Sequence, residues 1–65
     1  MKFTMKQARQ YAGLTQVEMA KRLNIALATY RDYEHGDSLM RVDKAIEFSH
    51  IVGVPLDNLI FLQFN

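Results

Sequence analysis

Two short helices joined by a tight corner constrain this chain more than any other feature of its sequence. Thr15 and Glu18 have the Thr-x-x-Glu spacing of a capping box, in which the hydroxyl and the carboxylate each satisfy a backbone amide left free at a helix start. Asn24 comes after the first apolar stripe, and Asn ends helices in the left-handed conformation at low steric cost. The sequence therefore predicts two helices, over residues 16–23 and 26–35.

Apolar residues fall on one face of each of these helices. Met19, Ala20 and Leu23 form the stripe of the first helix, and Tyr30 and Tyr33 form that of the second. Two short helices, a tight turn and a small residue, Ala20, at the point where the axes cross make a helix-turn-helix.

The residues of this motif resemble those of a known family. Leu-Thr-Gln-x-Glu-x-Ala-x-x-Leu-x-Ile from residue 14, followed by Tyr-x-x-Tyr-Glu-x-Gly from residue 30, is similar to the phage-repressor helix-turn-helix of the Cro/CI type, also called XRE. The resemblance extends from about Met5 to Leu59, because Ile-Val-Gly-Val-Pro-Leu-Asp-Asn-Leu resembles the last two helices of that family. It implies an all-α, compact five-helix lambda-repressor-like DNA-binding domain, with the helix-turn-helix at its second and third helices.

Cap and stop signals place two further helices. Thr4 and Gly13 bound a first helix over residues 4–12. A fourth helix is expected over residues 42–52, where Arg41 takes the place of the Ser or Thr cap that is usual in the family. The face of this helix that we expect to be buried holds six apolar residues: Val42, Ala45, Ile46, Phe48, Ile51 and Val52.

The C-terminal segment is unusually apolar. Pro55 suits the first position of a short fifth helix, expected over residues 55–61. Apolar and polar residues alternate in the tail, residues 61–65, which would permit a short strand. Such a tail either folds back on its own core or covers a second copy of the chain. Because the family commonly dimerises through its last helix and tail, the resemblance favours a homodimer contact there.

Length and composition exclude several classes of protein. The 65 residues suffice for one domain, residues 1–65, which is too small for a catalytic cleft of ordinary size, so we do not expect an enzyme. There is no Cys, and neither His has a partner at metal-ligand spacing, so no metal, cofactor or small-molecule ligand is expected. The longest apolar run, residues 59–62, is far too short to span a bilayer, which favours a cytoplasmic protein.

The distribution of charge says more than the net charge of +1. Residues 1–35 carry six Lys or Arg against three Asp or Glu, whereas residues 36–65 carry two against four. An asymmetry of this kind suits a protein with one phosphate-facing side, although any small protein divided in two shows some imbalance.

The resemblance also assigns roles on the outer face of the second helix of the motif. It implies base contacts from Ala26, Leu27, Ala28, Arg31 and Asp32, and phosphate contacts from Gln16, Thr29 and Arg41. The sequence departs from the family here, because Ala26, Leu27 and Ala28 lack hydrogen-bonding side chains and can only touch a thymine methyl or permit close approach. Arg31 is the first choice for reading guanine, while Asp32 could accept from a cytosine amino group.

A structural ion pair between Arg9 and Glu34 is implied as well. In the family, an Arg and a Glu at these positions pair behind the reading helix and fix the first helix against the third. Two alternatives stay open: Arg9 is an ordinary solvated charge, or Arg31 is the partner of Glu34, three residues along the same helix. The resemblance also implies that Tyr30 and Tyr33 lie in the core with their hydroxyls reaching its edge. The whole interpretation requires Tyr30 to lie inside and Arg31 outside.

Two functions of different classes fit these features. The first is sequence-specific binding of double-stranded DNA by a repressor-like transcription regulator, acting as a homodimer on a pseudo-palindromic operator with reading helices about 34 Å apart. The second is a protein-interaction module of the same fold, such as an antitoxin or the partner of another regulator, with weak or no DNA binding. The scarcity of polar groups at Leu27 and Ala28 favours the second, and Gln16 and Arg31 favour the first.

Overall fold

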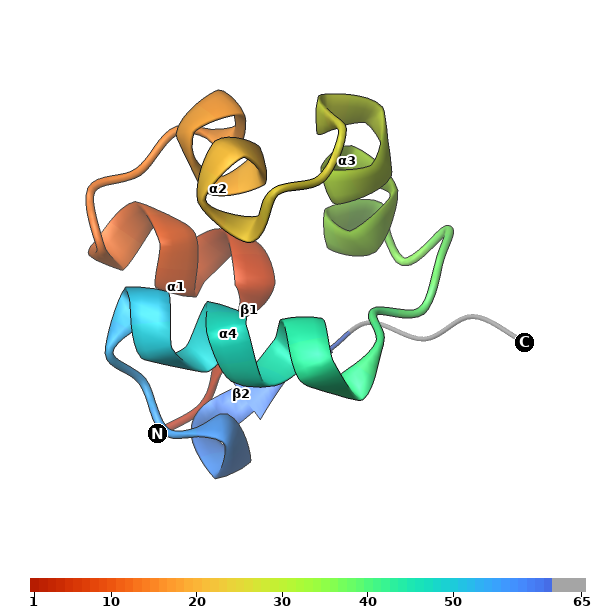
Figure 1. Cartoon of the computed structure of the whole chain (residues 1–65). Helices are drawn as coiled ribbons and strands as arrows, with labels where there is room; N and C mark the ends of the chain where they lie inside the picture. The colour runs from red at the N-terminus through yellow and green to blue at the C-terminus, as the bar shows by residue number, and fades with distance from the viewer. Residues whose placement is uncertain (62–65) are drawn as a thin grey trace.

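The structure, a computed structural model, describes residues 1–61 of the chain. Along these residues run β1 (Phe3–Thr4), α1 (Met5–Tyr11), α2 (Gln16–Leu23), α3 (Leu27–His35), α4 (Val42–Val52), the 3-10 helix η1 (Leu56–Asn58) and β2 (Leu59–Ile60). Figure 1 shows α2 and α3 at one end of the molecule, α1 below α2, and α4 passing beneath them, with η1 and β2 at the opposite end. The helix-turn-helix therefore lies away from both strands.

Side-chain caps define the start of the first two helices. The hydroxyl oxygens of Thr4 and Thr15 accept hydrogen bonds from the backbone N–H of Gln7 and Glu18, respectively. In return, the side chains of Gln7 and Glu18 accept from the backbone N–H of the two threonines, so both capping boxes are complete. The predicted bounds of α2 are confirmed, and those of α1 are one residue too long at each end.

The ends of α2 and α3 also follow the sequence signals. Asn24 ends α2 in the left-handed conformation, with φ 58°, and Gly36 ends α3 with φ 81°. This region of backbone space is costly for most residues but not for Gly and only modestly for Asn. The helix α3 begins one residue later than predicted because Ala26 is extended and serves as its N-cap. The predicted bounds of α4 are confirmed.

The hydrophobic core lies where α1, α2, α3 and α4 meet. Its ten buried residues are Met5, Ala8, Met19, Ala20, Leu23, Tyr30, Phe48, Val52, Val54 and Leu59. Two residues of α4 that were expected inside are exposed, Val42 to 72% and Ile46 to 44%. Val42 lies one turn before Ala45, the first buried residue of α4, so it extends past the core.

The predicted fifth helix, over residues 55–61, is wrong. Pro55 is followed by a single 3-10 turn, η1, and the chain then extends into β2. This strand pairs in parallel with β1, Phe3 beside Leu59 and Thr4 beside Ile60. The described residues therefore form four α-helices and a two-stranded sheet rather than a purely helical domain. A strand ladder with the other end of the chain satisfies backbone groups that a short helix would leave unpaired at its ends.

The predicted tail, residues 61–65, lies outside the described residues except for Phe61. The ring of Phe61 packs edge-on against Phe48, with the ring centres 6.4 Å apart. Among residues 1–61, no helix combines the length and the apolar character that crossing a membrane requires.

Candidate nucleic-acid interface

An ion pair on the inner face of α3 holds that helix to α1. The Nε of Arg9 lies 2.6 Å from Oε2 of Glu34, and the two side chains are only 9% and 3% exposed. A second guanidinium nitrogen of Arg9 donates to Oε1 of Glu34 at 3.4 Å, and the third donates to the Leu14 carbonyl at 2.8 Å. The structure thus brings together the two residues that the family resemblance pairs, and it excludes the two alternatives of a solvated Arg9 and an Arg31–Glu34 pair.

Two more side chains complete the coordination of the Glu34 carboxylate. The hydroxyl of Tyr30 donates to Oε2, and the side-chain amide of Gln16 donates to Oε1 at 3.0 Å. Within residues 1–61, no buried side-chain nitrogen or oxygen lacks a hydrogen-bond partner. The expectation that the Tyr30 hydroxyl reaches the edge of the core is therefore wrong: Tyr30 is fully buried, and its hydroxyl points at a carboxylate one helical turn away.

This network sets the protonation of its members. Burial raises the pKa of Glu34, but the hydrogen bonds from Arg9, Tyr30 and Gln16 and the charge of Arg9 outweigh burial, so the pKa lies below its ordinary value. The hydrogen bond to Glu34 raises the pKa of Arg9. Burial and the same carboxylate raise the pKa of Tyr30 far above its usual range, so its hydroxyl stays protonated and acts as a donor. Glu34 is therefore a carboxylate at neutral pH.

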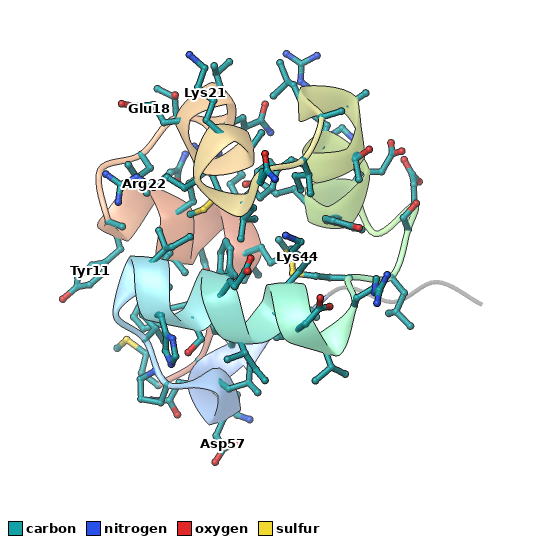
Figure 2. All side chains as sticks on the ribbon, in the orientation of Figure 1. Tyr11, Glu18, Lys21, Arg22, Lys44 and Asp57 are labelled. Atoms are coloured by element: carbon teal, nitrogen blue, oxygen red, sulfur yellow. The ribbon has the colours of Figure 1, made fainter. Side chains whose placement is uncertain are left out.

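A second contact fixes the corner between α2 and α3 from below. The ammonium group of Lys44, on α4, donates to the carbonyl oxygen of Leu23 at 2.7 Å and lies 3.3 Å from the Glu47 carboxylate. Figure 2 shows Lys44 reaching from α4 toward the gap between α2 and α3. A cation at the C-terminal end of α2 satisfies a carbonyl that has no partner within that helix.

The outer face of α3 is open. Four of its residues are exposed, namely Ala28, Arg31, Asp32 and His35, as is the N-cap Ala26. Thr29 is half-buried, and Leu27 is half-buried against the hydrophobic core, so only part of its side chain faces outward. The structure therefore places the predicted base-contacting residues on one surface, with Tyr30 inside and Arg31 outside as the interpretation requires.

A comparison with protein families identifies the family to which this chain belongs. A family model described as helix-turn-helix matches residues 5–59, which include α1 to α4 and the network around Glu34. The chain belongs to the Cro/CI-like (XRE) helix-turn-helix family. Members of this family are DNA-binding transcription regulators. The comparisons with curated proteins and with solved structures gave no match.

A surface depression borders the first turn of α2. This is the turn at which the family resemblance implies a phosphate contact. Lys6 and Gln10 of α1, residues 13–17, and Arg31 of α3 line the depression, with Arg9 at its base. Gln16 is half-buried there, and its side chain bonds to the network rather than standing free. Sequence reasoning missed Lys6, which is exposed one turn before Gln10. Only its helical spacing from Arg9 could have indicated it.

Folding leaves the excess of positive charge on this side of the molecule unchanged. Arg9 and Glu34 neutralise each other in the interior, so residues 1–35 keep five Lys or Arg against two Asp or Glu outside that pair. Lys21 and Arg22 remain exposed on α2, and Lys21 projects away from α4 (Figure 2). Arg41 is exposed at the start of α4, 3.5 Å from the Asp43 carboxylate, a surface pair of little energetic weight.

Sequence reasoning also missed two structural contacts at this site. The Tyr30 hydroxyl and the Glu34 carboxylate are four residues apart on α3, which is the spacing at which helical side chains meet, so the signal was present. The contact between Lys44 and the Leu23 carbonyl has no sequence signal, because it depends on how α4 crosses beneath α2.

Proposed function

We propose that this protein binds specific sequences of double-stranded DNA through α3 and acts as a repressor-like transcription regulator. The observation that supports this proposal best is the asymmetry of α3. Its inner face is locked to α1 and α2 through Glu34, while the side chains of Ala28, Arg31 and Asp32 on its outer face make no hydrogen bond within residues 1–61 except for one from Arg31 to Gln16. A rigid helix with a free outer face fits the major groove.

The outer face of α3 would read bases by a mixture of polar and apolar contacts. Arg31 can donate two hydrogen bonds to a guanine, and Asp32 can accept from a cytosine amino group. Ala26, Ala28 and the outward part of Leu27 offer only apolar contact, which suits thymine methyl groups. The proposed site is therefore a short sequence in which a G·C pair lies beside A·T pairs.

Phosphates would flank this contact on both sides. The depression at the start of α2 combines Lys6 with the backbone amides of the first helical turn, and Gln16 can offer the second hydrogen of its side-chain amide. On the other side, Thr29 and the exposed Arg41 are proposed to bind the backbone. Such contacts position the protein and carry no sequence information.

A homodimer is proposed to form through the C-terminal half of the chain. Leu39, Val42, Leu56 and Phe61 line one apolar depression, and Leu39 and Val42 are 65% and 72% exposed. Ile46 lies one turn along α4 from Val42 and is also exposed. Clustered apolar groups of this kind mark interaction surfaces in small proteins. A two-fold dimer would place two α3 helices about 34 Å apart on a pseudo-palindromic site.

The competing proposal is a protein-interaction module, and one observation favours it. The reading face presents Ala26, Ala28 and the acidic Asp32 and offers only one strong hydrogen-bond donor, Arg31. Such a surface is poor in the side chains that usually contact bases.

Titration of the full chain against a random-sequence duplex separates these two functions. Each phosphate that a Lys or Arg neutralises contributes about −0.9 to the slope of log affinity against log salt, so three such contacts should weaken binding roughly 40-fold between about 50 and 200 mM salt. A steep loss of affinity supports the DNA-binding proposal. Absence of binding at about 50 mM salt would contradict it and favour the protein-interaction module.

A further inference from the structure

Gln16 joins the buried carboxylate of Glu34 to the exposed guanidinium of Arg31. Its Nε2 donates to Oε1 of Glu34 at 3.0 Å, and its Oε1 accepts from Nε of Arg31 at 3.4 Å. These contacts use one end of the amide for the interior and the other end for the surface. The side chain therefore spans the distance from the core network to the outer face of α3.

The charge of Glu34 dictates which way this amide points. A carboxylate accepts hydrogen bonds only, so the NH2 group of Gln16 must face it and the carbonyl oxygen must face the other way. The carbonyl oxygen is the end that Arg31 meets. Because Glu34 is itself held by Arg9 and Tyr30, the orientation of Gln16 is fixed from inside the protein.

This contact leaves the productive part of Arg31 free. The hydrogen bond uses Nε, so both terminal nitrogens of the guanidinium are available for a bidentate contact with guanine or phosphate. A long exposed side chain held by one hydrogen bond loses less conformational entropy on binding than one that moves freely. Leu27, Ala28 and Ala26 cannot supply this polar contact.

We propose that Gln16 is a positioning residue that orients Arg31 for base readout, and that it thereby determines specificity. This inference rests on the proposed DNA-binding function. A positioning role for Gln16 and a direct phosphate contact by Gln16 predict different effects on DNA binding. Loss of a phosphate contact weakens binding to all sequences alike, whereas loss of a positioned arginine reduces discrimination between sequences.

The test compares affinity for a duplex selected by the wild-type chain with affinity for random duplex. The ratio of the two is the discrimination, and Arg31→Ala is expected to lower it about 5- to 150-fold. Gln16→Ala is expected to lower it at least about twofold, with no further loss when both residues are replaced. Gln10→Ala is the matched control, because Gln10 lines the same depression and contacts neither Glu34 nor Arg31 within the described residues.

Three outcomes overturn the inference in distinguishable ways. If the wild-type chain binds no duplex, the proposed function fails and the positioning role fails with it. Should Gln16→Ala weaken binding to both duplexes equally, Gln16 is a direct phosphate ligand and the function stands. If the effects of Gln16→Ala and Arg31→Ala on discrimination multiply in the double variant, Gln16 acts independently of Arg31.

A measurement on the free protein keeps the inference testable if Gln16→Ala folds poorly. The Nε–H group of Arg31 should show restricted motion in nuclear magnetic resonance relaxation, in contrast to that of the exposed Arg22. Gln16→Leu, which keeps most of the side-chain volume, should make Arg31 as mobile as Arg22, while Gln10→Ala should not. Equal mobility of the two arginines in the wild-type chain would contradict the positioning role.

Discussion

The two faces of α3 differ in almost every physical respect although they alternate along nine residues. On the inner face, Tyr30 and Glu34 are buried, and the carboxylate accepts four hydrogen bonds from three side chains. On the outer face, Ala28, Arg31 and Asp32 are exposed. The residues on the inner face of α3 should therefore determine the stability of the fold, and those on the outer face should determine recognition of a partner.

The largest difference in stability between the two faces should appear when the acidic residue on each face, Glu34 or Asp32, is replaced by alanine. Glu34→Ala leaves the buried guanidinium of Arg9 without its carboxylate, which costs about 3 to 5 kcal/mol. Since each kcal/mol lowers the Tm of so small a domain by roughly 4–8 °C, the Tm of this variant should fall by about 12–40 °C. Asp32→Ala, two residues away on the outer face, should change stability by less than about 0.5 kcal/mol. Thermal unfolding followed by circular dichroism measures both, and similar Tm values would erase the distinction.

Acid should weaken the inner face of α3 through Glu34. The pKa of Glu34 is lowered in the folded protein, so its contribution to stability is complete above the ordinary value of 4.5 and is lost as the pH falls through the folded value. Stability should therefore be flat from pH 7 to about 5 and fall below that. Glu34→Gln should have a lower Tm at pH 7 and a weaker dependence on acid. A Tm of Glu34→Gln that still falls as steeply as that of wild type would assign the acid sensitivity to other groups.

The start of α4 offers a substitution that should move stability and recognition in opposite directions. Arg41 is the N-cap of α4, but its side chain makes no capping hydrogen bond. Arg41→Ser should add one and stabilise the fold by about 1 kcal/mol, while removing a proposed phosphate contact. Tm should rise, and the slope of log affinity against log salt should become shallower by about one. A rise in Tm with no change in DNA binding would remove Arg41 from the interface.

Replacing an exposed apolar residue beside α4 should change neither the stability of a single domain nor its recognition of DNA. Val42 is 72% exposed in the first turn of α4, where a negative charge is favourable. Val42→Glu should therefore leave the fold intact and, if a second copy covers this surface, convert dimers to monomers in sedimentation at matched concentration. Asp43→Ala provides an exposed control on the same turn. An unchanged mass for Val42→Glu would place any dimer contact elsewhere.

Local signals in the sequence predicted most of the fold. Thr4, Thr15, Asn24 and Gly36 each act on backbone groups within a few residues, and the helix ends that they indicated agree with the structure within one residue. The segment from residue 55 was predicted incorrectly because its structure is decided by a pairing with β1 at the other end of the chain. Helical spacing is a local property and carries no information about such a partner.

The candidate site also has features that the sequence predicts and features that depend on contacts between separate helices. Which residues of α3 face outward followed from the helical period, and the family resemblance supplied the pairing of Arg9 with Glu34. The two bonds of Gln16 could not be predicted, because they depend on the separation between α2 and α3 and on the direction of an amide. No local sequence pattern predicts hydrogen bonds of this kind, which join side chains of two separate helices.

The footprint of a duplex on the protein tests the central claim most directly. Backbone amide signals of the full chain are followed by nuclear magnetic resonance while duplex DNA is added at low salt. The account predicts that the largest shifts fall on the first turn of α2 and on residues 26–32, while those of η1, at the opposite end of the molecule, change little. Shifts centred on η1, with residues 26–32 unaffected, would contradict it.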